Sequence, residues 1–173
     1  ARSFADLVMG DTARNLVRVF FLQNRLKSQG SKPAGKISKV HVVGAGVMGG
    51  DIAAWCALRG LRVTLQDQSA SLIAPAIARA HVLFKTQLKI PYLVQAAMDR
   101  LMADVNGAGV AKADVVIEAI FENMEAKQAL FKIIEPQLRP DALLATNTSS
   151  IPIEQLAECL VQPKRLVGLH FFN

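Results

Sequence analysis

The sequence has few cysteines, few aromatic residues and no long apolar run. Its 173 residues include two cysteines, Cys56 and Cys159, and neither has a histidine or a second cysteine at ligand spacing. Neither a zinc site nor a disulfide framework is therefore indicated, and both are expected to be small core residues in a reducing compartment. Asp51, Arg59 and Asp67 interrupt the apolar stretches well before the roughly 18 to 20 residues of a membrane span. No membrane-spanning segment is expected.

Basic residues are in excess but are not concentrated. The formal net charge is +6, yet the lysines and arginines are scattered and do not alternate with aromatic residues as in a nucleic-acid-binding surface. A solvated basic surface is favoured, and no nucleic-acid partner is expected. The arginine-rich N-terminus resembles a mitochondrial presequence in composition, but Asp6 and Asp11 disfavour that role and no cleavage pattern follows.

The N-terminal part of the chain has a helical pattern. Apolar residues recur near helical spacing between residues 4 and 27, with arginines and lysines between them, which predicts one amphipathic helix or two. The polar run "SQGSKPAGK" that follows has the composition of a linker. We therefore expect a boundary that separates residues 1–35 from residues 36–173.

From residue 39 onward, short β-branched runs alternate with longer helical ones. The pattern predicts strands at 39–43, 62–67, 114–119, 142–146 and 165–172, and helices at 48–60, 69–88, 92–102, 123–138 and 153–160. Pro75 is expected to interrupt the second of these helices. Strands separated by helices imply crossovers and a mainly parallel sheet covered on both faces. The fold class is therefore α/β, doubly wound and of the Rossmann type.

Three glycine-rich stretches could hold a phosphate, and two are rejected. "GSKPAGKI" at 30–37 has Ile37 where a magnesium-binding hydroxyl is required, and it precedes a strand instead of following one. "NGAGV" at 106–110 lacks a third glycine at the right spacing and predicts a turn. The third stretch, "VVGAGVMGGDIAAW", directly follows a strand and opens a helix, which is the context that dinucleotide binding requires.

Each glycine of this loop has a distinct expected role. Gly44 allows the tight turn, Gly46 lets the backbone approach a pyrophosphate, and Gly49 lets the helix pack close to the sheet with its N-terminus facing the anion. Asp67 follows at the end of the next strand, where a carboxylate accepts hydrogen bonds from ribose hydroxyls and repels a 2′-phosphate. Since "QDQSAS" contains no arginine, NAD is favoured over NADP. The alternative is an incidental turn with a surface aspartate.

Four segments resemble the NAD domain of the 3-hydroxyacyl-CoA dehydrogenases of fatty-acid β-oxidation. They are "VVGAGVMGGDIA", "ADVVIEAIFENMEAKQALF", "LLATNTSSIPI" and "RLVGLHFFN", in the right order across residues 39–173. "RLMADVNGAGVAKAD" is compressed where many relatives have a third strand. The N-terminal helix is more loosely similar to the segment that joins a hydratase/isomerase part to the dehydrogenase part in multifunctional enzymes of the alpha-subunit type.

The resemblance implies a role for individual residues. The pyrophosphate would meet the glycine loop, the adenosine ribose would meet the end of the second strand, and the nicotinamide-side ribose and the substrate would meet later strand ends. The implied cofactor-binding residues are Gly44, Gly46, Val47, Met48, Gly49, Asp67, Gln68, Ala119, Ile120, Glu122, Lys127, Asn147, Ser149 and Asn173. His170 would be the general base, because an imidazole titrates near neutral pH, and Ser149 would hydrogen-bond the reacting oxygen.

Each of these residues also has a simpler interpretation. Ser149 or Ser150 could only cap a helix, and a lone histidine in an apolar strand is usually a buried structural residue. Lys127 and Glu122 could form an ordinary exposed pair.

The resemblance also implies an activity, partners and a compartment. The parent enzyme would oxidise 3-hydroxyacyl-CoA to 3-ketoacyl-CoA with NAD, with a thiolase subunit as a possible partner, in the bacterial cytoplasm or in a eukaryotic mitochondrion or peroxisome. A glutamate that orients the histidine, and a helical domain for the acyl-CoA, would follow Asn173, so this chain alone is expected to bind NAD without turnover. The alternatives are a non-catalytic NAD-binding module and another Rossmann hydroxy-acid dehydrogenase, which "NTSS" and "HFFN" disfavour.

Overall fold

The structure, a computed structural model, describes residues 6, 9–29 and 36–171, and the chain divides into two units, residues 1–36 and residues 37–173. The main element of the first unit is helix α2 (Asp11–Gln29). Most of its apolar side chains are exposed, among them Leu16, Phe20, Phe21 and Leu26. The predicted N-terminal helix is therefore present from Asp11 onward, whereas the expected linker at residues 30–35 lies outside the described residues.

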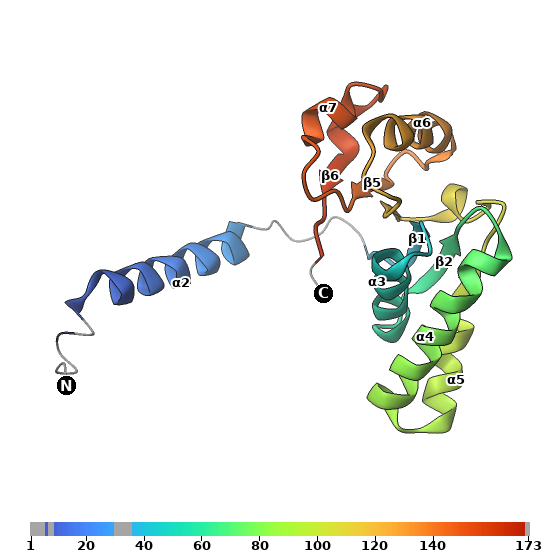
Figure 1. Cartoon of the computed structure of the whole chain (residues 1–173), viewed down its shortest axis with the longest axis horizontal. Coiled ribbons are helices and arrows are strands. Elements are labelled where there is room, and N and C mark those ends of the chain that lie inside the picture. The colour runs from blue at the N-terminus through green and yellow to red at the C-terminus, as the bar shows by residue number, and fades with distance from the viewer. Residues whose placement is uncertain (1–5, 7–8, 30–35, 172–173) are drawn as a thin grey trace. The chain divides into compact units, whose positions relative to one another are not determined.

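The second unit is built on a six-stranded sheet in which every pairing is parallel (Figure 1). Its order is β3-β2-β1-β4-β5-β6, so the chain moves outward from β1 in one direction and then, from β4, in the other. The strands are β1 (Lys39–Val43), β2 (Arg62–Gln66), β3 (Leu101–Ala103), β4 (Val115–Glu118), β5 (Leu143–Thr146) and β6 (Leu166–Gly168). This arrangement confirms the predicted Rossmann-type fold, in which ligands bind where the strand order reverses, here between β1 and β4.

Helices cover both faces of the sheet. The first layer contains α3 (Val47–Leu58), α4 (Ala70–Leu88) and α5 (Pro91–Asp99), and the second contains α6 (Met124–Ile134) and α7 (Ile153–Ala157). Successive strand residues face opposite layers, so Val42 packs under α3 and Val43 under α6. Burying an apolar side chain such as Phe84 or Phe131 stabilises the fold by about 1.5–3 kcal/mol.

Three predicted elements differ in the structure: the end of the helix expected at 92–102, the helix that contains Pro75, and the last strand. Residues 101–103, expected at the end of a helix, form β3, which pairs with β2 and leaves Met102 half exposed. Helix α4 continues through Pro75 without a break. A proline one and a half turns into a helix removes one backbone bond, the one to the carbonyl of Ser71, and both residues lie on the exposed side of the helix, where this carbonyl is accessible to solvent.

The last strand is shorter than expected. β6 ends at Gly168, although a strand was predicted through residue 172. Its partner β5 ends at Thr146, and the final bond of the ladder is from Leu169 N to the Thr146 carbonyl, 2.9 Å apart. Since β6 pairs only with β5 in the described sheet, the chain beyond Leu169 has no strand to continue along.

The crossover from β3 to β4 contains only a 3-10 turn (Val110–Lys112) instead of an α-helix. It covers His41, whose Nε2 lies 2.8 Å from Gln66 Oε1 and whose Nδ1 lies 2.7 Å from Thr64 Oγ1. Burial lowers the pKa of His41, which favours the neutral ring. In the neutral form Nε2 donates to the amide oxygen and Nδ1 accepts from the hydroxyl. A Cβ on Gly109 would approach Thr64 Oγ1 to 2.1 Å. Close packing against Thr64 therefore explains why a glycine stands at this position of the "NGAGV" stretch, which was rejected as a phosphate-binding loop.

Asp114 fastens the opposite, N-terminal edge of the sheet. Its Oδ2 accepts hydrogen bonds from Ser38 N and Lys39 N at 2.8 and 2.9 Å, and its Oδ1 accepts one from Arg139 at 2.7 Å. The backbone bonds from Ser38 and Lys39 are the main reason that the pKa of Asp114 is lowered to about 2. The ionised carboxylate thereby ties the start of β1 to the residue before β4.

Two kinds of feature were not found in the described part of the chain. Within residues 6, 9–29 and 36–171, no helix is both long and apolar enough to cross a membrane. The same residues contain no group of three or more His, Cys, Asp or Glu side chains suited to a metal ion. Cys56 and Cys159 are half buried and pack against the two core clusters, and burial raises the pKa of each thiol.

Candidate functional site

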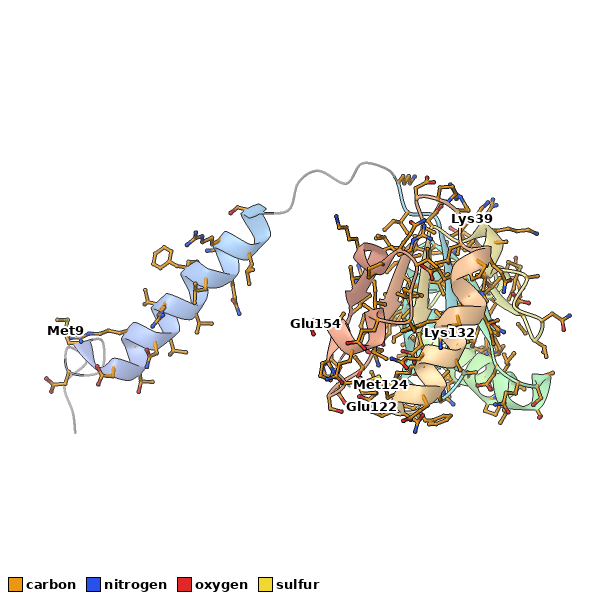
Figure 2. The ribbon with its side chains drawn as sticks, turned by 90° about the horizontal axis from the view of Figure 1, so that it is seen from above. Met9, Lys39, Glu122, Met124, Lys132 and Glu154 are labelled. Atoms are coloured by element: carbon orange, nitrogen blue, oxygen red, sulfur yellow. The ribbon has the colours of Figure 1, made fainter. Side chains whose placement is uncertain are left out.

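Most of the predicted site residues lie at the carboxyl ends of the strands. Figure 2 shows Lys39, at the start of β1, and Glu122, just after β4, at opposite ends of the sheet. Because all six strands are parallel, the loops that follow β1, β2, β4, β5 and β6 share the edge that carries Glu122. The sequence positions of these residues are far apart, and the fold brings them to one edge.

The glycine loop requires its glycines for two different reasons. Gly44 has φ = +103°, a conformation that other residues rarely adopt, and a Cβ there would lie 2.4 Å from the Ala119 carbonyl oxygen. A Cβ on Gly49 would lie 1.9 Å from the Gly44 carbonyl oxygen. Both glycines therefore permit a tight turn in which β1, the start of α3 and the residues after β4 touch one another.

Gly46 differs, because it faces open space. Among the described residues, apart from its chain neighbours and the backbone of its own helix, no atom lies within 4 Å of a Cβ built on Gly46, and its φ of −58° suits any residue. The first bond inside α3 runs from Gly50 N to the Gly46 carbonyl, 2.9 Å, so the N–H groups from Gly46 to Gly49 precede the helical ladder. Gly46 has no side-chain cap. This geometry fits an anion that is held by the helix N-terminus.

Asp67 follows β2 and is hydrogen-bonded to the glycine loop. Its Oδ2 accepts from Ala45 N at 2.7 Å and its Oδ1 accepts from Gln68 N at 2.7 Å. Each carboxylate oxygen has a second lone pair, so the group retains acceptor capacity for a ribose hydroxyl. Arg79 of α4, which the sequence reasoning did not single out, donates to the Gly46 carbonyl at 3.1 Å and also forms an ion pair with Asp51 at 3.6 Å.

The second part of the site contains a buried ion pair. Lys127 is 1% exposed, and its Nζ lies 2.6 Å from Oε1 of Glu118, which is fully buried. The interpretation of Lys127 as part of an exposed pair is therefore wrong. The sequence reasoning also did not single out Glu118, although a glutamate that ends an apolar strand and is followed nine residues later by a lysine was a signal for such a pair.

Glu122 organises the "NTSS" segment. Its Oε1 accepts from Thr148 Oγ1 at 2.6 Å, Ser149 N at 3.0 Å and Ser150 N at 3.1 Å, whereas Ser149 Oγ is 3.4 Å away. Burial alone would raise the pKa of Glu122, but the hydrogen bonds from Thr148, Ser150 and Ser149 outweigh it and lower the pKa to about 2. Neither serine caps α7, because Pro152 precedes the helix and no side chain bonds to its first turn.

His170 lies two residues beyond β6 and is exposed, so it is not a buried core residue. Asn147 holds the adjacent chain, since its Oδ1 accepts from Phe171 N at 2.9 Å. Phe171 and Met48 line one cavity of about 450 Å³ along α3, so the segment with His170 reaches the start of α3. Asn173, the last predicted cofactor-binding residue, lies outside the described residues.

Comparisons with known proteins agree with this geometry. The family model "3-hydroxyacyl-CoA dehydrogenase, NAD binding domain" matches residues 39–173. The fatty acid oxidation complex subunit alpha of Shewanella baltica is 34% identical over the whole chain, and the corresponding subunit of Psychrobacter arcticus is 36% identical. The chain spans about a quarter of the length of these curated relatives, 26% and 25% respectively.

Solved structures are similar over the second unit. A 3-hydroxybutyryl-CoA dehydrogenase from Escherichia coli is 36% identical with a TM-score of 0.76, covering 80% of this chain and 30% of its own. An (S)-3-hydroxybutyryl-CoA dehydrogenase from Ralstonia eutropha is 32% identical with a TM-score of 0.75, covering 80% and 50%. The open Gly46, the α3 amides and Asp67 fit NAD as the cofactor. The chain belongs to the family of NAD-binding domains of 3-hydroxyacyl-CoA dehydrogenases.

Proposed function

We propose that the chain is the NAD-binding part of an enzyme that oxidises 3-hydroxyacyl-CoA to 3-ketoacyl-CoA. The observation that carries the proposal is the arrangement of Glu122 and Ser149. Glu122 fixes the Ser149 backbone through a 3.0 Å bond, while the Ser149 hydroxyl, at 3.4 Å, is held weakly. A hydroxyl that is positioned but weakly bonded is suited to turn toward a substrate oxygen.

The proposed chemistry divides between two side chains. His170 accepts the proton of the 3-hydroxyl group as general base, and Ser149 Oγ donates a hydrogen bond to the same oxygen. Bound NAD supplies the acceptor for the hydride that leaves C3. Asn147 fixes the chain beside His170 through its bond to Phe171 N, which keeps the imidazole near the "NTSS" segment.

The remaining predicted residues are proposed to bind the cofactor. The loop of Gly44, Gly46, Val47, Met48 and Gly49 would hold the pyrophosphate, and Asp67 with Gln68 the adenosine ribose. Ala119, Ile120, Glu122 and Lys127 would form the nicotinamide side, with Asn147 and Asn173 near the ring. Lys127 would act through its neighbours, because its buried ammonium lies 3.5 Å from Glu122 Oε2 and 3.4 Å from the Ile120 carbonyl oxygen.

The names of the relatives support a wider proposal. The relatives are named as alpha subunits of fatty acid oxidation complexes. We therefore propose that the parent enzyme of this chain carries a hydratase part and associates with a thiolase subunit in the cytoplasm.

The cofactor part of the proposal is tested with the chain itself. Calorimetric titration should give tighter binding of NAD than of NADP, because Asp67 faces the position of a 2′-phosphate, and Asp67→Ala should narrow the difference. Equal affinity of the unaltered chain for both cofactors would contradict this assignment.

The catalytic part requires a full-length enzyme that contains this chain. There His170→Gln should abolish NADH formation from 3-hydroxybutyryl-CoA and leave the affinity for NAD unchanged. Retained turnover would show that another group is the base.

A further inference from the structure

One buried carboxylate joins three segments of the nicotinamide side of the site. Glu118 Oε1 accepts hydrogen bonds from Ile120 N at 2.8 Å and from Lys127 Nζ at 2.6 Å, and its Oε2 accepts one from Thr146 Oγ1 at 2.6 Å. These partners belong to the loop after β4, to α6 and to the end of β5. Thr146 directly precedes Asn147, so the third bond reaches the "NTSS" segment.

Glu118 also determines where the ammonium of Lys127 lies. Lys127 Nζ has three acceptors, of which only Glu118 is close: the Ile120 carbonyl is 3.4 Å away and Glu122 Oε2 is 3.5 Å away. An ammonium has three donors, and here one makes a short bond while two make long ones. The short bond fixes the nitrogen at a point within 3.5 Å of both Ile120 and Glu122.

Stability alone gives a weak reason for this pair. Removing two charges from water is costly, and apolar residues of similar volume often stabilise a fold as well as or better than a buried ion pair. The pair lies instead where its geometry matters for binding, since Lys127 contacts Ile120 and Glu122, two residues proposed to line the nicotinamide-side ribose.

We propose that Glu118 is a positioning residue for NAD, which acts through Lys127 on the nicotinamide half of the cofactor and leaves the adenosine half unaffected. The inference rests on the proposed function. It predicts that a change at Glu118 weakens the binding of NAD but not the binding of ADP, because ADP shares with NAD only the adenosine and the two phosphates.

The test uses the 173-residue chain and calorimetric titration with NAD and with ADP. Glu118→Gln keeps the shape of the side chain and removes its charge, so the Lys127 ammonium loses the partner that holds it beside Ile120 and Glu122. NAD should bind roughly 10- to 100-fold more weakly, the size of effect that follows when a partner that orients a ligand-binding side chain is lost. ADP should bind within about twofold of its affinity for the unaltered chain. Lys127→Met should give the same pattern.

A double variant separates positioning from folding. Glu118→Gln/Lys127→Met leaves no unpaired buried charge, so it should unfold at a higher temperature than Lys127→Met. Its loss of NAD affinity should be no greater than that of either single variant, because the two residues act as one unit. Additive losses would overturn the proposal.

Glu135→Gln is the matched control. Glu135 is also a buried glutamate, 8% exposed, which accepts from Val161 N and Gln162 N at the other end of α6. The control should lower thermal stability and leave the affinities for NAD and ADP unchanged.

The outcomes distinguish the inference from the proposed function. If Glu118→Gln binds NAD as tightly as the unaltered chain, or loses ADP and NAD affinity equally, Glu118 is not a positioning residue for the nicotinamide half. If the unaltered chain binds neither ligand, the proposed function itself fails.

Discussion

Gly46→Ala should separate cofactor binding from folding in this protein. In the part of the chain that the structure describes, the new Cβ meets no atom within 4 Å beyond its own turn, and a φ of −58° is allowed for alanine. Alanine is a poorer residue than glycine at a helix N-cap by about 0.5–1 kcal/mol. The smaller conformational freedom of the unfolded chain offsets this by about 0.4–1 kcal/mol. The free energy of unfolding should therefore change by less than about 0.5 kcal/mol.

NAD binding should respond much more strongly. The methyl group would occupy the space in which a pyrophosphate approaches the amides at the start of α3, and each charged hydrogen bond that is lost costs about 1.5–3 kcal/mol. Loss of one such bond weakens binding roughly 10- to 100-fold. Calorimetry with NAD and urea unfolding of the same preparation measure both quantities.

Gly49→Ala is the contrasting variant. Its Cβ would lie 1.9 Å from the Gly44 carbonyl oxygen, so the backbone must shift and the fold should lose about 1–3 kcal/mol of stability. If Gly46→Ala binds NAD as tightly as the unaltered chain, the pyrophosphate does not lie against this loop and the assignment of the site is wrong.

Four further predictions concern stability and activity. Asp114→Asn should lower the free energy of unfolding by about 1 to 2 kcal/mol at pH 7. Because the pKa of the Asp114 carboxyl is lowered to about 2 in the fold, the difference in unfolding free energy between the variant and the unaltered chain should shrink as the pH falls from about 4 toward 2. An undiminished difference at pH 2, measured by urea unfolding, would show that the ionised carboxylate is not the source of the stabilisation. Gly109→Ala should lower the unfolding temperature, because its Cβ would lie 2.1 Å from Thr64 Oγ1, and an unchanged temperature would show that the crossover is mobile. Deleting residues 1–34 should leave the NAD affinity and the unfolding temperature nearly unchanged, and unfolding of the shortened chain would place the boundary elsewhere. The 173-residue chain alone should form negligible NADH from 3-hydroxybutyryl-CoA at saturating NAD, and turnover within tenfold of a full-length relative would show that it already holds a complete substrate site.

The fold could be predicted, and the glycine loop and Asp67 of the candidate site could be proposed, because their signals are local. The short β-branched run "KVHVV" is nearly continuously apolar, which is typical of a strand buried on both faces, and four of its five residues are buried. The glycine pattern that directly follows it is a constraint on neighbouring backbone atoms. Gly44, Gly46, Gly49 and Asp67 were therefore identified from spacing alone. Short elements could not be predicted in this way. The three residues of β3 continue a helical pattern in the sequence and form a strand only because they pair with β2.

The second half of the site depended on contacts between distant residues. Sequence alone determined the alternation of strands and helices, the dinucleotide loop and the presence of His170 after an apolar run. Only the tertiary structure decided that Lys127 is buried, that Glu118 neutralises it and that Glu122 binds the "NTSS" segment 26 to 28 residues further along. The burial of a charged side chain is set by the elements that pack over it, and its partners are set by the edge of the sheet where separate strands end together; neither is encoded in the residues beside it in the chain.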